Sequence, residues 1–495
     1  MSQLTAVDAT FLNAETSTTH AHIAGLAVVD ASLCPGGRLT AGAVADLIRE
    51  RAHLAARPLR RRLAQVPFGL DHPYWEDDPA FDPRRHILEI GLPAPGGPGE
   101  LADVCAMLHE RPLDRTRPLW EIVVIHGLAD GMTGVYIKSH HAAIDGVSAA
   151  EALAALLDLT PEPREVPADD AEPEYAPSPA GMLGAGLLKA ALSPLQTALS
   201  AVRAAPYLDE IPGVSQVPGV AAVSHMMQEA LGLDEMPRAP RTVAPPTPFN
   251  RPIGPRRSFA YGSLDLGEIK EIRRALGGSV NDVVMALCAT ALRQWLDKRG
   301  ALPEGPLVVG VPVSLRKPAR RNGEENEPAN RLSIMTTPLA VHVADPAERY
   351  AAVRRDLELG KRRFAISGSD WVRELTEMLP APLAGPLWRL AQQALPAFSV
   401  RPMNLMISNV PGPQFPLYLC GARLHGYYPA SVVTDISGGI NITVFSYDGK
   451  VDVGVIACRD LVPTPSEVID HLTDALDELR GLARESEPEG LARES

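Results

Sequence analysis

Apolar and polar positions divide the chain into two structured parts joined by a proline-rich middle. In the first part, up to about residue 160, short apolar runs predict strands, and the helical spacing of Val44, Leu47 and Ile48 predicts an amphipathic helix. The predicted strands are 22–29, 120–125 and 133–137, and the predicted helices are 41–54, 101–110 and 147–157. A glycine-containing turn at 127–131 makes the last two strands a hairpin.

The second part begins near residue 255 and repeats the alternation of strands and helices. Its predicted strands are 257–264, 307–313, 334–343, 405–409, 431–435, 440–447 and 451–457. Its predicted helices are 266–276, 279–296, 346–362, 371–397 with a break at 380–382, and 465–482. Because hairpins occur beside the alternating elements, we expect an α/β fold built of two units with mixed sheets.

The middle of the chain is irregular except for one amphipathic stretch. Residues 161–179 are dominated by Pro, Glu, Asp and Ala, which is typical of a linker. Within 181–205 apolar residues recur at helical spacing, and Pro194 should kink this helix. It is interpreted either as a surface helix that touches lipid or shapes an apolar tunnel, or as a helix packed on a domain. A short helix is expected near 223–231.

These patterns predict four regions: an N-terminal domain at 1–160, a linker region at 161–254, a C-terminal domain at 255–482 and a disordered tail at 483–495. Two polar segments of the first domain have no apolar periodicity. The basic cluster 60–62 is interpreted as the solvated face of a helix, and the acidic, aromatic segment 75–81 as a loop or an edge.

Composition narrows the classes of function. The net charge of −13 argues against nucleic acid as a partner, because phosphate binding needs clustered Lys and Arg. The five cysteines are scattered and form no metal-binding spacing, so we expect a reducing, cytosolic setting without a metal. Residues 1–4 lack the basic start of a secretory signal, and without an uninterrupted run of 18 apolar residues no transmembrane helix is expected.

The candidate chemistry lies where the apolar run 133–137 ends. His140 and His141 follow this predicted strand, and Asp145 and Gly146 precede the next predicted helix. A histidine at a strand end can be held rigidly and still reach substrate, as a general base requires. The chain has no nucleophile elbow, Walker loop or dinucleotide fingerprint in the right context. A neutral imidazole can deprotonate a hydroxyl when the acyl donor is pre-activated, and a thioester is such a donor.

An oxyanion donor should lie opposite His141, in the second unit. Asn281 is the best candidate, because it begins the predicted buried helix, where an amide and a helix N-terminus can act together. The alternative is that Ser279 or Asn281 only caps this helix. Asp145 is expected to hold the turn rather than to relay protons, with Arg316 as one candidate partner.

Several motifs together resemble a known family. Residues 140–146 (HHAAIDG) match the HHxxxDG motif of the chloramphenicol acetyltransferase-like acyltransferases. The surrounding segments are LTAVDATFL at 4–12, PLDRTRPLWE at 112–121, Asn281-Asp282, SNVPGP at 408–413 and GINITVFSY at 439–447. They resemble the bacterial wax ester synthase/diacylglycerol acyltransferase family. Two departures are His20-Ala21, where the family usually has Pro-Met, and Ala329-Asn330, where Gly-Asn is expected.

The resemblance implies two chloramphenicol acetyltransferase-like domains with an active-site tunnel between them. It implies acyl-CoA as co-substrate without a cofactor, and diacylglycerol or a long-chain alcohol as acceptor. The catalytic set would be His141 as base, His140 as its structural neighbour, Asp145 and Gly146 as the turn, and Asn281. The residues that would shape the substrate site are Pro118, Leu119, Trp120, Asp282, Asn409, Pro411 and Gly412. A cytoplasmic enzyme, peripheral at the inner membrane or at lipid droplets, is expected.

Three other hypotheses stay open. The acyl donor could be a carrier-protein thioester, as in condensation-type enzymes. The amphipathic stretch 181–205 also fits a lipid-surface binding protein without catalysis. A weaker option assigns His140 and Asp145 to the His-x₄-Asp pattern of glycerol-phosphate acyltransferases, although the basic surroundings usual for phosphate are not evident.

Overall fold

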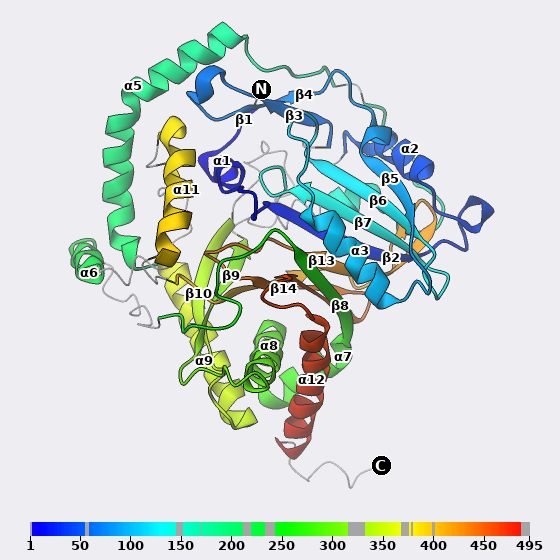
Figure 1. Cartoon of the computed structure of the whole chain (residues 1–495), viewed down its shortest axis with the longest axis vertical. Helices are drawn as coiled ribbons and strands as arrows, with labels where there is room; N and C mark the ends of the chain where they lie inside the picture. The colour runs from blue at the N-terminus through cyan, green and yellow to red at the C-terminus, as the bar shows by residue number, and fades with distance from the viewer. Residues whose placement is uncertain are drawn as a thin grey trace.

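The computed structural model contains two six-stranded sheets, one small sheet and the helices that cover them (Figure 1). The described residues are 2–54, 59–144, 152–169, 171–210, 219–232, 243–314, 332–367, 376–377, 380–397 and 401–486. Both large sheets mix parallel and antiparallel neighbours, so the predicted α/β class with mixed sheets is confirmed.

The first sheet carries the histidine motif. Its strands, in spatial order, are β12 (Tyr418–Leu419), β13 (Ala422–Ala430), β2 (His22–Asp30), β7 (Thr133–His140), β6 (Trp120–His126) and β5 (Ile87–Gly91). The β6–β7 hairpin forms as predicted, whereas β5 was not anticipated. Helix α2 (Ala41–Arg51) packs on one face of this sheet, and α3 (Pro98–Glu110) lies between the other face and strand β8 of the second sheet.

The second sheet holds the larger hydrophobic core. Its strands, in spatial order, are β10 (Leu332–Leu339), β9 (Leu307–Ser314), β11 (Leu405–Pro411), β14 (Ile440–Tyr447), β15 (Lys450–Cys458) and β8 (Arg257–Asp265). Helices α7 (Leu266–Leu276), α8 (Val280–Asp297), α9 (Pro346–Ser367) and α12 (Ser466–Ser486) cover one of its faces (Figure 1). Thirteen of the 18 residues of α8 are buried, on most of its faces, as its apolar sequence predicts.

Strand β13 belongs to the first sheet and contacts β14 and β15 of the second, and it was not predicted. It comes late in the chain but pairs antiparallel with β2, from Arg423 opposite Asp30 to Ala430 opposite Ala24. The register shifts between Leu424 and Gly426, so a bulge interrupts the period-two pattern that would reveal a strand. The predicted strand 431–435 is wrong: this segment is a loop with one isolated bridge.

The small sheet corrects two interpretations. Its strands are β1 (Ser2–Gln3), β4 (Tyr74–Asp77) and β3 (Arg61–Ala64), with β4 in the centre. The cluster at 60–62 therefore leads into strand β3, which begins at Arg61, and is not a solvated helix face. Arg61 is buried because two carboxylates, Asp77 at 3.4 Å and Glu174 at 3.1 Å, neutralise it. The acidic segment 75–81 was predicted as a loop or an edge, but its first residues belong to β4, the central strand of this sheet.

Of the remaining helices, α5 (Pro179–Ala204), α6 (Val220–Ala230) and α11 (Ala381–Ala397) lie in stretches that were predicted to be helical, whereas α1 (Ala6–Asn13) was not predicted. Helix α5 runs through Pro194 and lies on the outside of the molecule (Figure 1). In the predicted helix 147–157, residues 152–156 are helical and 147–151 lie outside the described residues. Among the described residues no single helix suffices by length and composition to cross a membrane, and only the α7–α8 pair, bent by 100°, meets that test jointly.

Candidate functional site

The end of strand β7 places the two histidines of the motif. His140 closes the strand opposite His22 of β2, and its backbone N–H donates to the Leu119 carbonyl at 2.9 Å. The backbone N–H of His141 donates to the Ala21 carbonyl at 2.7 Å. The loop therefore begins from a backbone that is hydrogen-bonded on both sides, which gives the rigid attachment that a catalytic side chain needs.

His140 faces inward and supports the loop. Its side chain is 1 % exposed, and its Nδ1 accepts the backbone N–H of Ala142 at 3.0 Å. A neutral imidazole that accepts at Nδ1 carries its proton on Nε2. The Nε2 atom lies 3.3 Å from Oε1 of Glu15, an ion-pair distance without strict hydrogen-bond geometry. Nδ1 is thus bonded within the loop, and Nε2 is buried close to the Glu15 carboxylate.

His141 has different surroundings. Its ring stacks on the ring of Phe11 in α1, with centroids 3.9 Å apart and planes 8° apart. Phe11 was not predicted as a site residue, although it lies within one of the family motifs. A parallel aromatic stack fixes the plane of the imidazole, and a base that must meet its proton in a set geometry needs such a fixed plane.

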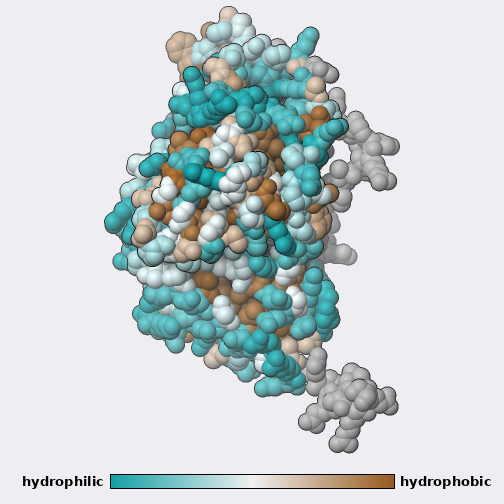
Figure 2. All heavy atoms as spheres, turned by 90° about the vertical axis from the view of Figure 1, so that its right-hand side faces the viewer, coloured by the Kyte–Doolittle hydropathy of each residue, from teal (hydrophilic) through white to brown (hydrophobic). Residues whose placement is uncertain are grey.

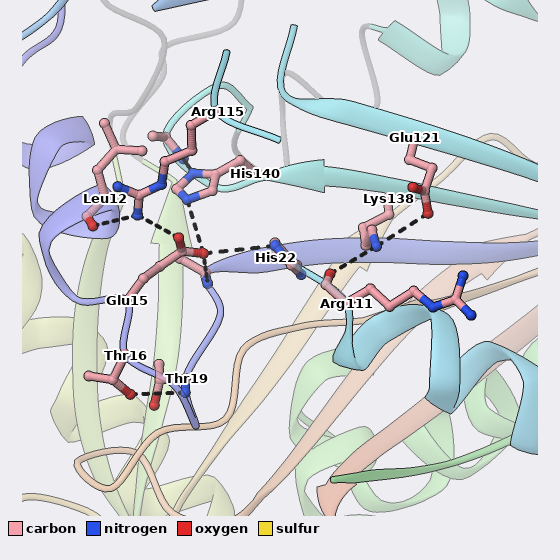
Figure 3. A network of polar contacts seen from close by, with 12 residues as sticks. Leu12, Glu15, Thr16, Thr19, His22, Arg111, Arg115, Glu121, Lys138 and His140 are labelled. Atoms are coloured by element: carbon pink, nitrogen blue, oxygen red, sulfur yellow. Dashed lines mark hydrogen bonds and ion pairs between the residues drawn. The ribbon is translucent and has the colours of Figure 1, made fainter. Parts of the chain in front are cut away.

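Glu15 connects the histidines to the segment before β6. Its Oε1 accepts the backbone N–H of Ala21 at 2.9 Å, and its Oε2 accepts from Arg115, which also donates to the Leu12 carbonyl at 2.8 Å (Figure 3). Burial by itself would raise the pKa of Glu15, but the contacts with His140 and Arg115 hold it far below its usual range. Glu15 is therefore ionised at pH 7.

Further histidines surround His140. His20 stacks on His22 at 5.4 Å, and His109 meets His22 edge-on at 6.0 Å. Burial lowers the pKa of His20, lowers that of His22 well below its ordinary value and lowers that of His109 to about 3. These rings are neutral at pH 7. The departure at His20-Ala21 therefore adds an imidazole to the cluster without adding charge.

The Pro118-Leu119-Trp120 segment supports the loop from the neighbouring strand. Leu119 and Trp120 are buried, and Trp120 pairs with Ser139 across the β6–β7 ladder. The indole N–H donates to the Leu59 carbonyl at 2.7 Å, and the ring stacks on His86 at 4.5 Å. These contacts fix the start of β6, next to the strand end that carries His140.

In the second unit, the residues at the start of α8 have different roles. Ser279 is the N-cap, and it exchanges hydrogen bonds with Asp282 at 3.2 and 2.8 Å. Asp282 also pairs with Lys361 at 3.2 Å, so its oxygens are used in structure. Asn281 is not the cap: its Oδ1 accepts from Nδ2 of Asn409 in β11 at 3.2 Å. This bond leaves both donors of the Asn281 amide nitrogen for another acceptor.

The β11 end shows why Gly412 is glycine. Its N–H donates to the Ser446 hydroxyl at 3.2 Å, and a Cβ atom at this position would lie 2.4 Å from the Ser446 carbonyl oxygen. Pro411 is exposed at the end of the strand. The predicted residues thus form a histidine group in the first sheet and an asparagine group in the second. Asp145, Gly146, Arg316 and Ala329-Asn330 lie outside the described residues.

Comparisons with known proteins agree with the fold and the motifs. The model of the wax ester synthase/diacylglycerol acyltransferase catalytic domain matches residues 4–284, and that of the WS/DGAT C-terminal domain matches residues 329–480. A Mycobacterium tuberculosis H37Rv protein, provisionally named as a diacylglycerol O-acyltransferase, is 36% identical over 99% of this chain and 92% of its own length. A second such protein of that strain is 34% identical, over 96% and 98%.

Solved structures give the same picture. The wax ester synthase/diacylglycerol acyltransferase of Marinobacter aquaeolei VT8 superimposes with a TM-score of 0.65 and 28% identity, covering 98% of this chain and 100% of that one. The starter condensation domain of rhizomide synthetase shares the fold, with a TM-score of 0.51, 13% identity and coverage of 97% and 94%. Fold and matches together define an acyltransferase with two chloramphenicol acetyltransferase-like domains. The chain belongs to the wax ester synthase/diacylglycerol acyltransferase family, and the resemblance is confirmed.

Three residues of the histidine group were missed from the sequence. Phe11, Glu15 and Arg115 carry no catalytic spacing of their own. Only the fold brings α1 and the segment before β6 against the end of β7. A sequence contains many acidic and basic residues that form ordinary ion pairs on the surface. No sequence signal therefore distinguishes Glu15 and Arg115 from such pairs.

Proposed function

We propose that this enzyme transfers the acyl group of an acyl-CoA to the hydroxyl of diacylglycerol, of a long-chain alcohol, or of both, with His141 as general base. The observation that carries the proposal is the setting of His141. Its backbone is fixed at the end of β7, and Phe11 stacks on its ring, whereas His140 is buried and its Nδ1 accepts the backbone N–H of Ala142. The family of the chain supports a thioester donor and an oxygen acceptor.

The chemistry needs one base and one oxyanion donor. The acceptor hydroxyl attacks the thioester carbonyl carbon while His141 takes the hydroxyl proton, which gives a tetrahedral intermediate and an imidazolium. When the intermediate collapses, the carbon–sulfur bond breaks, and the thiolate of CoA recovers the proton from His141. General-base assistance contributes about 10²–10⁴ in rate, and one oxyanion donor about 2.7–4 kcal/mol.

Asn281 is the proposed oxyanion donor. The Asn409 side chain engages the Asn281 carbonyl oxygen, so the amide plane is held and its N–H groups point away from that contact. The α8 N-terminus adds the positive end of a helix dipole, although Asp282 in the first turn offsets part of it. This arrangement requires both units to face one substrate channel, and the tunnel implied by the family remains a prediction.

The surface of α5 and its neighbours supports a lipid-associated location. Large apolar side chains are exposed on α5, α6 and α11, including Leu188 at 64 %, Val202 at 63 % and Met226 at 63 %. By contrast, the side away from α5 and α11, shown in Figure 2, is hydrophilic above and below, with apolar patches at mid-height. Lys189 of α5 is paired with Asp71 at 2.8 Å. We therefore infer a cytoplasmic enzyme that rests on a membrane or lipid-droplet surface by apolar contact.

One vesicle experiment tests this location. The protein should sediment with zwitterionic vesicles that contain diacylglycerol, and this binding should persist at high salt. The reason is that the attachment is apolar and the chain carries a net charge of −13. Leu188→Glu should weaken it, whereas Leu33→Glu, at an equally exposed leucine in the turn after β2, should not. Equal binding of the two variants would refute this surface assignment.

A matrix of donors and acceptors tests the proposed function. Radiolabelled palmitoyl-CoA is offered with diacylglycerol or with hexadecanol, and the products are separated by thin-layer chromatography. Labelled triacylglycerol or wax ester formed without any carrier protein supports the proposal. Transfer only from a carrier-protein thioester would favour the condensation-type alternative. Lipid binding without transfer to any acceptor would favour a non-catalytic binding protein.

A further inference from the structure

Glu15 is a partly buried carboxylate that the proposed chemistry does not use. It follows α1 and lies between the ends of β2 and β7, where its side chain is 13 % exposed (Figure 3). The chain from Glu15 to Ala21 turns back on itself, because Thr16 and Thr19 hydrogen-bond through backbone and side chain. This turn delivers the Ala21 N–H to Oε1 of Glu15 at 2.9 Å.

The Glu15 carboxylate supports His141 from both sides. On one side, Ala21 donates its N–H to Glu15 and accepts the backbone N–H of His141 at 2.7 Å. On the other side, His140 directs Nε2 toward Glu15, and its Nδ1 accepts the N–H of Ala142. The residues immediately before and after His141 are therefore tied to one carboxylate, directly or through a single residue.

Arg115 holds this carboxylate in place. Its guanidinium donates to Oε2 of Glu15 and to the Leu12 carbonyl at the end of α1, which is also the helix of Phe11. The ring that stacks on His141 and the carboxylate that supports its backbone are thus fastened by the same side chain. Charge-assisted bonds of this kind are about twice as strong as neutral ones, and they are directional.

We propose that Glu15, fixed by Arg115, is a positioning residue that sets the orientation of His141 for proton transfer. This inference rests on the proposed function of His141. The physical requirement is geometric, because a general base must lie within hydrogen-bond reach of the proton it takes, and a misplacement of about 1 Å can cost about 10²-fold in rate. Glu15 itself transfers no proton in this account.

Glu15→Gln tests the proposal with little change of shape. The amide keeps one acceptor oxygen but places an NH₂ group against either Arg115 or the Nε2–H of His140, so one of the two contacts becomes repulsive. We expect kcat to fall by about tenfold or more, which is about 1.4 kcal/mol, while KM for acyl-CoA stays within about twofold. Arg115→Gln, at a more exposed residue, should give a smaller loss in the same direction.

Glu89→Gln is the matched control. Glu89 also accepts from an arginine, Arg38, from a backbone N–H, that of Ala41, and from a histidine, His126. It lies on β5 at the edge of the first sheet, four strand positions from β13 and two from β7. The same chemical change there should leave kcat and KM unaltered.

A readout without turnover separates this proposal from the proposed function. Diethyl pyrocarbonate modifies accessible imidazoles, and His140 is protected by its burial and its two contacts. Peptide mass spectrometry should show His140 modified at least about fivefold faster in Glu15→Gln than in the wild type or in Glu89→Gln. Faster modification together with lower kcat is the expected result.

The other outcomes are also decisive. Unchanged modification, or an unchanged kcat despite faster modification, would overturn the positioning role while leaving the acyltransferase proposal intact. If the wild type transfers no acyl group to any acceptor, the proposed function fails. The modification rates alone then decide whether Glu15 orders the histidine loop.

Discussion

The Asn281–Asn409 pair allows the sharpest test of the second half of the site. Asn281→Ala removes the proposed oxyanion donor and should lower kcat by about 10²–10³, or about 2.7–4 kcal/mol. Asn409 touches Asn281 through one neutral hydrogen bond of 3.2 Å between partly exposed side chains. Such a bond contributes about 0.5–1.5 kcal/mol, so Asn409→Ala should lower kcat by about 2- to 13-fold.

The double variant distinguishes orientation from an independent contribution. If Asn409 acts only by orienting Asn281, the double variant should be no slower than Asn281→Ala alone, because the oriented group is already absent. Asn281→Asp tests whether negative charge develops beside residue 281. A carboxylate would repel the developing oxyanion, so this variant should have a lower kcat than Asn281→Ala. The kcat of the four variants and of the wild type is measured at saturating acyl-CoA, with circular dichroism as the control for folding. Additive losses, or an aspartate variant as fast as wild type, would refute the oxyanion role.

Three further predictions follow from the packing. Phe11→Leu removes the ring that stacks on His141. Such a stack contributes about 0.5–1.5 kcal/mol, so kcat should fall by about 2- to 13-fold. The control Phe68→Leu, at a ring that is 89 % exposed, should have no effect on kcat. His109 has its pKa lowered by burial from 6.5 to about 3, so the unfolded chain binds more protons in this window and stability should fall as pH drops from about 6.5 toward 3. Urea unfolding at pH 7 and pH 5 should show a smaller loss for His109→Gln than for wild type, and an equal loss would contradict this cause. Gly454→Ala would place a Cβ 1.8 Å from the Pro429 carbonyl oxygen, where β15 meets β13. It should destabilise the protein by about 1–3 kcal/mol or more, measured by thermal melting. Gly305→Ala, where a Cβ meets no atom within 4 Å, should leave the stability unchanged.

Elements whose signals are local could be predicted from the sequence. Helix α7 spans Leu266–Leu276 as predicted, because Asp265 caps its start and Gly277 at φ 76° ends it. The strand that leads to His141 was equally readable, since its apolar run ends at the polar residues 138–141. Ser279 and Asn281 could not be separated from sequence, because both are good capping residues, and only the Asn409 contact distinguishes them.

Features that depend on distant segments could not be predicted. β13 is a strand only because β2 offers it an edge almost 400 residues earlier, and its bulge hides the alternation. The basic cluster at 60–62 was assigned to solvent because arginines are usually exposed, but Asp77 and Glu174 neutralise Arg61 across the small sheet. Phe11, Glu15 and Arg115 acquire their roles in the same way, through tertiary contacts with the histidine loop.

The most direct test of the account is the turnover of His141→Ala with radiolabelled palmitoyl-CoA and the acceptor that the wild type prefers. We expect kcat to fall by about 10²–10⁴ in a folded protein, while His425→Ala, at a histidine in the β13 bulge, keeps wild-type turnover. Near wild-type turnover by a folded His141→Ala protein would contradict the assignment of His141 as the general base.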